Sequence, residues 1–305
     1  MGGHGGATLN IQNGAHVTSN QFYLGYDQNT DNTGANGIVN VTGAGSSLAA
    51  AAYLRVADYF FTSGTLTISQ GGTVTSVSGA TAGTSSGIAS TNNSTGSIVV
   101  TGANSSWTNT GNLYVGKGGT GGIGTLTVAS AGNVNITGAV SINATSTLNI
   151  GTGGTAGSFS AASVANSGLI HFNHTDTVTY ATPTSGTGAL TKDGTGTLII
   201  TGTHTYTGAT TVNGGIFRVN GTLGNTAVTI NTGATLGGSG TIAGAVNIAN
   251  GGILAPGNSP GTITVGTLTL NSGSIENYEL ARRMRWAVRP TISLSSTATS
   301  SWTAH

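Results

Sequence analysis

The chain has 305 residues, of which 53 are glycine and 5% are charged, and its formal net charge is +1. Ordinary soluble domains carry roughly 25% charged residues, and a nearly neutral chain gives no reason to expect binding to nucleic acid or to an anionic membrane. The absence of cysteine excludes disulfides and thiolate metal sites, and the 4 prolines exclude a collagen-like or polyproline chain.

Apolar residues make up 36% of the chain, and Val, Ile, Leu and Ala alternate with Thr, Ser and Asn along much of it. This alternation, together with the low net charge, favours stacked β-strands over disorder. No apolar run reaches the ~18–20 residues of a membrane-spanning helix. The opening MGGHGGATLN lacks the basic and apolar regions of a signal peptide, so we expect no export signal in this chain.

The first half of the chain carries an internal repeat. Gly37–Asp58 aligns with Gly96–Lys117 at an offset of 59 residues, so that Leu48 corresponds to Trp107. A second set with nearly the same spacing comprises Leu9, Leu66 and Leu126. Because 59 residues is too long for one slim coil, we expect each unit to span two or three coils of roughly 20–30 residues.

The repeat also bears on the alanine run between Leu48 and Tyr53. Alanine favours helix, but the matching segment after Trp107 reads Thr-Asn-Thr-Gly and does not. Since equivalent positions should share a backbone, we predict a loop at Ala49–Ala52 and a strand at Tyr53–Ala57, with a single helical turn as the alternative. The later runs Leu113–Gly116 and Gly124–Val128 follow an L-x-V-G…G-x-L-x-V pattern that resembles the repeats of bacterial autotransporter passengers.

Short alternating runs continue through the rest of the chain and predict further strands. Before residue 190 these are Val134–Thr137, Ala139–Asn143, Thr147–Ile150, Leu169–Phe172 and Thr177–Tyr180. After residue 221 they are Ala227–Asn231, Ala234–Leu236, Thr241–Ile242, Ala245–Ala249, Gly252–Leu254, Thr262–Val265 and Thr267–Asn271.

Leu190–Gly221 has the features of one coil of a parallel β-helix. Three strand-like runs, Thr197–Thr201, Ala209–Val212 and Gly215–Val219, are separated by turns that contain Gly or Asn. The stretch resembles the autotransporter-associated β-strand repeat of type V secretion passengers. The matching residues are Leu190-Thr-Lys-Asp-Gly194, Gly196-Thr-Leu198, Thr205-Tyr-Thr-Gly208 and Thr211-Val-Asn-Gly-Gly215.

Composition changes abruptly near the C-terminal end. Gly251–Leu270 resembles the segment that ends such repeat blocks, but no glycine follows Gly273, and four of the eight basic residues lie between Arg282 and Arg289. We therefore expect Ala281–His305 to be a basic tail outside the solenoid, either disordered or a short helix. The alternative is an amphipathic helix over Asn277–Val288 that caps the last coil.

Two glycine-rich motifs imitate nucleotide-binding loops. Gly119–Gly124 matches G-x-G-x-x-G, but a strand rather than the required helix is expected after it, so its phosphate-binding mechanism fails. Gly111–Gly118 lacks the Ser or Thr that would bind magnesium. Ser259 lacks the strand-turn-helix context of a nucleophile elbow. We predict no cofactor site.

The densest titratable group is His171, His174 and Asp176. In a strand, positions 174 and 176 share one face and 171 lies on the other, so we read these as polar surface or turn residues rather than metal ligands. The carboxylates Asp27, Asp31, Asp58, Asp176, Asp193, Glu276 and Glu279 are too sparse to form the paired acids of a polysaccharide-cleaving groove. We predict no catalytic and no metal-binding residues.

Threonine pairs recur around an apolar residue, at Thr65/Thr67, Thr125/Thr127, Thr177/Thr179, Thr262/Thr264 and Thr267/Thr269. Such ladders can bind ice, but Thr is also the favoured outward residue of a polar strand. Irregular coil lengths favour the second interpretation.

Together these patterns predict an all-β chain, a right-handed parallel β-helix of roughly a dozen coils that stack at ~4.8 Å per coil into one elongated rod. We divide it into residues 1–150 with the 59-residue repeat, 151–280 with the autotransporter-type repeat, and the tail 281–305. The interior residues are expected to be Leu9, Leu66, Leu126, Leu198, Ile200, Val212, Leu236, Val246, Leu254 and Leu268.

What the resemblance implies is a non-enzymatic passenger, displayed on the cell surface or secreted, whose export signal and translocator barrel lie outside this chain. We expect it to act as a monomeric stalk. The alternatives are an adhesin that binds a host-surface or matrix ligand, a β-helix polysaccharide lyase or hydrolase, and an ice-binding protein. Exposed aromatic side chains on successive coils would favour the adhesin, and clustered carboxylates in a groove would favour the enzyme.

Overall fold

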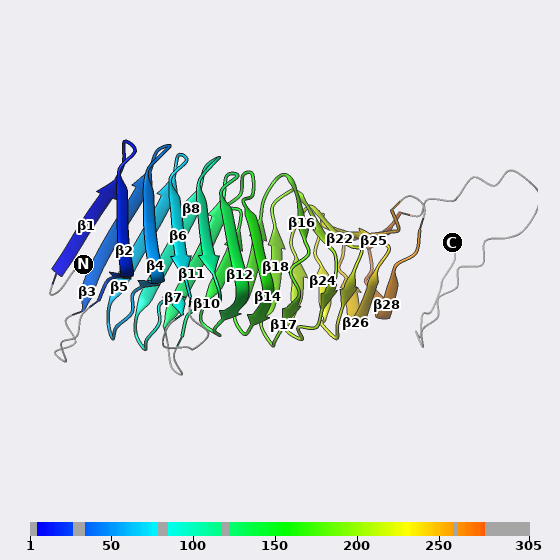
Figure 1. The fold of residues 1–305 in the computed structure, drawn as a ribbon. Helices are drawn as coiled ribbons and strands as arrows, with labels where there is room; N and C mark the ends of the chain where they lie inside the picture. The colour runs from blue at the N-terminus through cyan, green and yellow to red at the C-terminus, as the bar shows by residue number, and fades with distance from the viewer. Residues whose placement is uncertain (1–4, 27–33, 79–84, 118–121, 259–260, 278–305) are drawn as a thin grey trace, which may run out of the picture.

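The computed structural model describes residues 5–26, 34–78, 85–117, 122–258 and 261–277, and these residues form strands and no helix. The strands make three sheets, and each pairing between named strands is parallel. Neighbouring strands in a sheet come from different turns of the chain, which therefore winds into a parallel β-helix. Figure 1 shows the coils stacked in a single elongated rod. The predicted fold is confirmed.

The largest sheet has fourteen strands: β1 (Gly5–Ile11), β3 (Ala35–Thr42), β5 (Ser63–Ser69), β8 (Thr95–Thr101), β11 (Ile123–Ala129), β13 (Thr147–Ile150), β15 (Leu169–Asn173), β18 (Ala189–Asp193), β20 (Thr203–His204), β21 (Thr210–Val212), β23 (Thr222–Leu223), β24 (Val228–Ile230), β26 (Thr241–Ile248) and β28 (Thr264–Leu270). It runs the length of the rod.

Two shorter sheets follow one another along the rest of the wall. The first has nine strands: β2 (His16–Leu24), β4 (Ser47–Val56), β6 (Thr73–Val77), β7 (Ser86–Ile88), β9 (Ser106–Thr110), β10 (Leu113–Val115), β12 (Asn133–Ile142), β14 (Ser158–Asn166) and β17 (Thr184–Ser185). The second has six: β16 (Thr177–Tyr180), β19 (Thr197–Ile200), β22 (Ile216–Val219), β25 (Thr235–Gly238), β27 (Ile253–Pro256) and β29 (Ile275–Glu276).

Coils are longer in the N-terminal half of the rod than in the C-terminal half. Side-chain hydrogen bonds between adjacent coils join residues 30 apart at Asn10 and Asn40, 22 apart at Asn149 and His171, and 18 apart at Asn213 and Asn231. In the largest sheet, residues that pair in register from coil to coil form a column with one residue per coil. The column has twelve members, in agreement with the expected dozen coils. They are Leu9, Val39, Leu66, Ile98, Leu126, Leu148, Ile170, Leu190, Thr210, Val228, Val246 and Leu268.

The 59-residue repeat spans two coils, because Leu48 pairs with Val74 and Val74 pairs with Trp107. Leu48 and Trp107 thus occupy equivalent positions, as the repeat predicted, but both lie in strands. The loop predicted at Ala49–Ala52 is wrong, because these residues are part of the continuous strand β4. Ala49 and Ala50 pair in register with β2 on one side and β6 on the other, and Ala51 and Ala52 lie at a register shift of the β2–β4 pairing. Sheet pairing thus overrides the helix preference of alanine.

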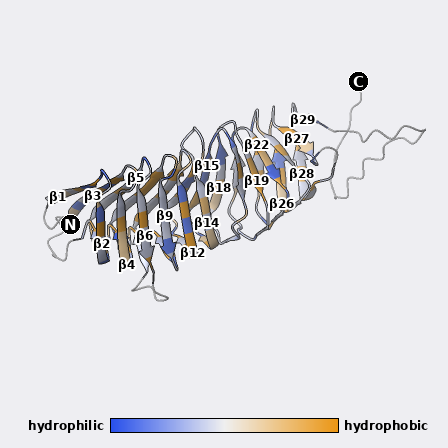
Figure 2. Ribbon diagram, turned by 45° about the horizontal axis from the view of Figure 1, so that its top comes forward, coloured by the Kyte–Doolittle hydropathy of each residue, from blue (hydrophilic) through white to orange (hydrophobic). Residues whose placement is uncertain are grey.

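The core is a column of apolar side chains inside the coils. Strand alternation places Leu198 and Ile200 inside, while Ile199 between them is only partly buried. Figure 2 shows the resulting mixture of apolar and polar residues along the strands. Eight of the ten predicted interior residues are buried. Leu9 and Leu268 are only partly buried, because they lie in the first and last described coils and are covered on one side alone.

Three pairs of predicted short strands are in fact single strands. Apart from one or two end residues, Val134–Thr137 and Ala139–Asn143 fall in β12, Thr241–Ile242 and Ala245–Ala249 in β26, and Thr262–Val265 and Thr267–Asn271 in β28. In β12 and β26 a register shift lies where a break was expected. β-bulges of this kind let a strand bend around a corner without ending. The sequence prediction also missed β14, whose residues are mostly Ser and Ala.

Glycine allows the coils to stack closely at their corners. Gly215 has φ of 65°, and a Cβ there would collide with the carbonyl oxygens of Gly196 and Gly194 on the preceding coil. Only glycine combines this left-handed conformation with so close an approach. Coil stacking thus requires glycine at position 215 of the repeat.

Candidate ligand-binding surface

Aromatic side chains gather where β2 and β4 end, near the N-terminal end of the rod. The ring centroids of Tyr23 and Tyr53 are 5.6 Å apart, and their hydroxyl oxygens lie 2.6 Å apart. The ring centroid of Tyr26 lies 4.7 Å from that of Tyr23 and 5.7 Å from that of Tyr59. Burial, and then the hydrogen bond with Tyr53, raise the pKa of Tyr23. The rings are thus held in fixed, tilted and edge-to-face geometry on two successive coils.

Arg55 joins this cluster from the outer side of β4. Its guanidinium carbon lies 4.6 Å from the centre of the Tyr53 ring, and Nη1 donates a hydrogen bond of 2.7 Å to Oδ2 of Asp58. Burial raises the pKa of Asp58, and Arg55 opposes that rise. The buried carboxylate therefore orients the guanidinium over the aromatic ring.

The sheet register extends the same surface to later coils. Tyr23 pairs with Arg55, Arg55 with Gly87, and Gly87 with Tyr114. Gly87 has no side chain, and the side chain of Ser90 fills the space where a Cβ of residue 87 would lie, so the outward column is interrupted between Arg55 and Tyr114. We call this row, with Tyr53 and Lys117, the aromatic–basic stripe.

Lys117 forms the far end of the stripe. Its Nζ lies 5.1 Å from the centre of the Tyr114 ring. Burial, and then repulsion from Arg55, lower the pKa of Lys117. Beyond it lies a hollow of about 330 Å³ lined by Gly116, Lys117, Ser141, Ile142, Asn143, Ala165 and Ser167. The stripe thus leads from aromatic rings to a shallow depression.

A ladder of polar side chains crosses the largest sheet. Its hydrogen bonds have lengths of 2.6–3.3 Å, and it runs through Thr127, Asn149, His171, Asp193, Asn213 and Asn231. Nε2 of His171 lies 2.7 Å from Oδ2 of Asp193. Burial tends to raise the pKa of Asp193, but hydrogen bonds from Asn213 and His171 outweigh it and hold that pKa below its usual value. These groups stabilise stacked coils, as in Asn ladders.

The structure separates His171 from His174 and Asp176, which stay in contact with each other. His171 belongs to the polar ladder, whereas His174 is fully buried and its Nδ1 donates to the backbone oxygen of Asp176 at 3.0 Å. The expected surface position of His174 is wrong, because the residue follows β15 with its side chain fully buried. No group of three His, Asp or Glu side chains that could hold a metal occurs in the described parts of the chain.

The carboxylates that the structure describes lie on different coils: Asp58 after β4, Asp176 before β16, Asp193 at the end of β18 and Glu276 in β29. Asp27, Asp31, Glu279, Ser259 and the tail 281–305 lie outside the described residues, as does Gly119 with its neighbours 118–121. The segment after that glycine motif is strand β11, as expected. Within the described ranges, no helix could cross a membrane.

Lys192 is a structurally important residue that the sequence argument missed. Its side chain is fully buried, and Nζ donates to the carbonyl oxygens of Asp193, Gly194 and Gly214 at 2.8, 3.0 and 3.2 Å. Burial lowers the pKa of Lys192 to about 8. The alternation of β18 gives the signal, since Lys192 shares the inward side of the strand with Leu190.

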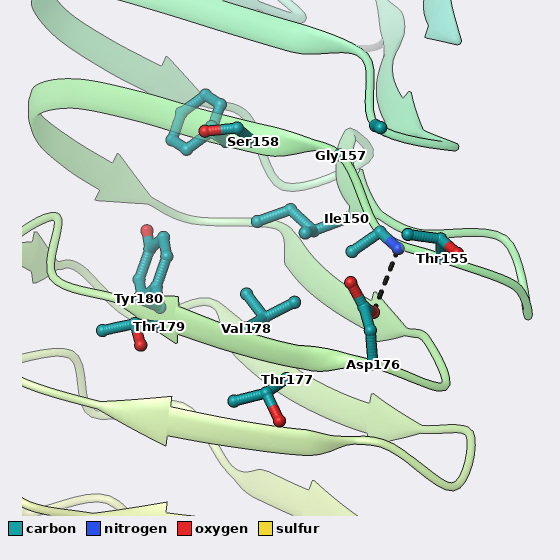
Figure 3. A pocket seen from close by; sticks show the side chains of 12 residues that line it. Ile150, Thr155, Gly157, Ser158, Asp176, Thr177, Val178, Thr179 and Tyr180 are labelled. Atoms are coloured by element: carbon teal, nitrogen blue, oxygen red, sulfur yellow. Dashed lines mark hydrogen bonds between the residues drawn. The ribbon is translucent and has the colours of Figure 1, made fainter. Parts of the chain in front are cut away.

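A second hollow, of about 370 Å³, interrupts the wall between β14 and β16. Figure 3 shows Ser158 on one side and Thr177–Tyr180 on the other, with Ile150 between them. At one end Oδ1 of Asp176 accepts a hydrogen bond of 3.1 Å from the backbone N–H of Ala156. We call this hollow the wall notch.

Comparison with known proteins gives two matches. A family model described as passenger-associated-transport-repeat matches residues 190–219, within the stretch that the sequence resemblance singled out. The adhesin BmaC autotransporter of Brucella suis biovar 1 (strain 1330) is 35% identical over 281 residues, which is 83% of this chain and 8% of that protein. The chain thus spans less than a tenth of this relative's length. No solved structure matches.

Proposed function

We propose a function for this chain, which belongs to the repeat-bearing autotransporter passengers. It is a non-enzymatic, surface-displayed or secreted rod that binds a glycan along the aromatic–basic stripe. The observation that carries the proposal is the alignment of Tyr23, Arg55 and Tyr114 on one outward column of the nine-stranded sheet. The name of the relative, an adhesin, agrees with it.

The chemistry of the stripe suits a sugar. A tyrosine ring presents a flat apolar face to the C–H groups of a pyranose, and its hydroxyl can hydrogen-bond at the edge. Arg55 and Lys117 add donors that their contacts with Tyr53 and Tyr114 hold in place. Because the rings are already held by Tyr–Tyr and cation–π contacts, little ordering is needed on binding.

The non-enzymatic part of the proposal is supported by the partners of the carboxylates. Glycan hydrolysis needs a pair of carboxyl groups free to act on one glycosidic bond, whereas Asp58 is bound by Arg55, Asp176 by the N–H of Ala156, and Asp193 by His171 and Asn213. We expect no turnover of pectin, alginate or glycosaminoglycan panels by the full chain. Turnover that one carboxylate substitution abolishes would contradict this expectation.

Glycan-array binding of the full chain tests the adhesin proposal. We expect binding to a defined set of glycans, weakened at least tenfold by Tyr114→Ala and by Lys117→Ala. The matched control is Thr67→Ala, an outward residue of β5 on the largest sheet, which should bind as the wild type does. Absence of glycan binding, or equal loss in the control, would favour a stalk without a ligand of its own.

A further inference from the structure

The wall notch is bordered by two strand edges that no described strand covers. β16 pairs with β19 on one side and with no described strand on the other. β14 pairs with β12, but its opposite edge is covered only at Val164 and Ala165, by β17. Successive coils that touch elsewhere along the rod therefore separate here.

The backbone groups along these edges can be assigned from the hydrogen bonds on the opposite sides. The carbonyl oxygens of Asp176 and Tyr180 accept from β19 and the residue after it, so alternation directs the N–H and C=O groups of Thr177 and Thr179 toward the notch. In β14, the N–H of Ser158 donates to Gly132, so the polar groups of Phe159 face the notch. An uncovered strand edge is a template for another strand.

The side chains at the notch also indicate a missing layer. Val178 aligns with Leu198, and Phe159 aligns with Val134; both partners are fully buried. Yet Val178 and Phe159 are themselves only partly buried. The same partial exposure occurs at Leu9 and Leu268, in the first and last described coils, where no further described coil lies above. The apolar side chains at the notch are therefore exposed in the same way as those of the first and last described coils, although the notch lies in the middle of the rod.

We propose that the wall notch binds an extended peptide segment of another protein, which adds as a strand to the edge of β16. The segment would be about four to six residues long, the usual length of a short strand. Its alternate residues would be apolar and would cover Val178 and Phe159. A row of N–H and C=O groups selects a polypeptide backbone over a sugar. The Asp176 carboxylate, engaged by Ala156 and His174, fixes the end of the notch.

The probe for this site is a fluorescein-labelled peptide that copies residues 195–202, Thr-Gly-Thr-Leu-Ile-Ile-Thr-Gly, the segment that already pairs with the other edge of β16. Its binding to the full chain is measured by fluorescence anisotropy and by amide hydrogen exchange. We expect saturable binding that slows exchange at Thr177 and Thr179, while Val178 and Tyr180, which already face β19, change little. A peptide with alternate N-methylated amides should bind at least tenfold more weakly.

The matched protein variants are Thr179→Pro, which removes one notch-facing N–H, and Thr179→Val, which keeps it. The first should weaken peptide binding at least tenfold, and the second should not. If Thr179→Pro fails to fold, the N-methylated peptide still tests the proposal. Equal exchange protection of Thr177 and Val178 in the free chain would overturn it, because the edge of β16 would then already be covered.

Two further results would also overturn it. The first is binding that N-methylation leaves unchanged. The second is protection of Thr177 and Thr179 that rises with chain concentration and is insensitive to the peptide, because a second copy of the chain would then be the occupant.

Discussion

At the scale of single residues, the unusual feature is a set of buried ionisable groups in the C-terminal half of a nearly uncharged chain. Lys192, His174 and His204 are each no more than 1% exposed. Each donates to backbone carbonyl oxygens at a corner, His204 through Nε2 to Thr201 at 2.8 Å. Corner carbonyl oxygens that turn inward need donors, and these three side chains supply them.

Replacing Lys192 with Met should destabilise the chain by about 1–3 kcal/mol, because three inward carbonyl oxygens lose their donor. The matched control is Thr191→Val, at the outward neighbour on β18, which should change the free energy of unfolding by less than ~0.5 kcal/mol. Chemical denaturation at pH 7 measures both. Equal stability of the two variants would contradict the structural role of Lys192.

The pKa of Lys192 near 8 predicts a pH dependence. Between about pH 8 and the pKa of an ordinary lysine, the unfolded chain binds more protons at this site than the folded chain. The free energy of unfolding should therefore rise with pH, by at most ~1.4 kcal/mol per pH unit. The difference between wild type and Lys192→Met isolates this contribution, measured over a window of about pH 8 to 9.5. A difference that stays constant over this window would contradict the lowered pKa.

The buried histidines make the stability of the chain depend on pH at acidic pH. Burial lowers the pKa values of His174 and His204, so the unfolded chain takes up protons below about pH 6.5 while the folded chain does not. Stability should therefore be full above that pH and fall as the pH drops. His174→Gln keeps a donor and removes the titration, and its thermal midpoint should fall less between about pH 6.5 and 5. An equal fall of the thermal midpoint in the variant and the wild type would contradict a contribution of His174 to this pH dependence.

At the scale of elements, strand alternation predicts the inward face well and the strand ends poorly. The inward residues of β19 and β25 follow from period-2 patterns, and most of them are buried. Strands that bend at corners, such as β12 and β26, were divided in two, because the sequence shows the polar corner but not the register shift that carries pairing across it. β14 was missed because small Ser and Ala residues carry little pattern.

Leu198→Asp should unfold the coils around β19, since Leu198 is fully buried between Val178 and Phe217 and an unpaired charge cannot be accommodated there. Ile199→Asp, one residue away on the outer side, should cost less than ~1 kcal/mol. Limited proteolysis and thermal unfolding distinguish them. Similar protease resistance for both variants would contradict the inward assignment.

The candidate surfaces were less predictable than the fold. The aromatic–basic stripe depends on pairing Tyr23 with Arg55 and, two coils later, Tyr114. Coil lengths differ there, so the sequence alone does not align these residues. The wall notch depends on the absence of pairing between β14 and β16, and a missing contact leaves no mark in a sequence pattern.

At the scale of the whole molecule, stability is the sum of contacts between adjacent coils. These contacts are continuous along the largest sheet but interrupted on the other wall at the notch. We expect the rod to unfold in two steps, with the coils before β14 and after β16 losing hydrogen-exchange protection at different denaturant concentrations. A single transition with uniform protection would show that the largest sheet alone couples the halves. The division of the chain at residue 150 stays a prediction.

The difference in coil length between the two halves determines how much each residue adds to the length of the rod. A coil adds the same height, about 4.8 Å, whether it contains 30 residues, as at Asn10, or 18, as at Asn213. Residues in the thin half therefore extend the molecule further per peptide bond, whereas those in the wide half enlarge its circumference. Deleting one thin coil should shorten the rod as much as deleting a wide one, while insertions at the corners of wide coils change its girth and leave its height unaltered.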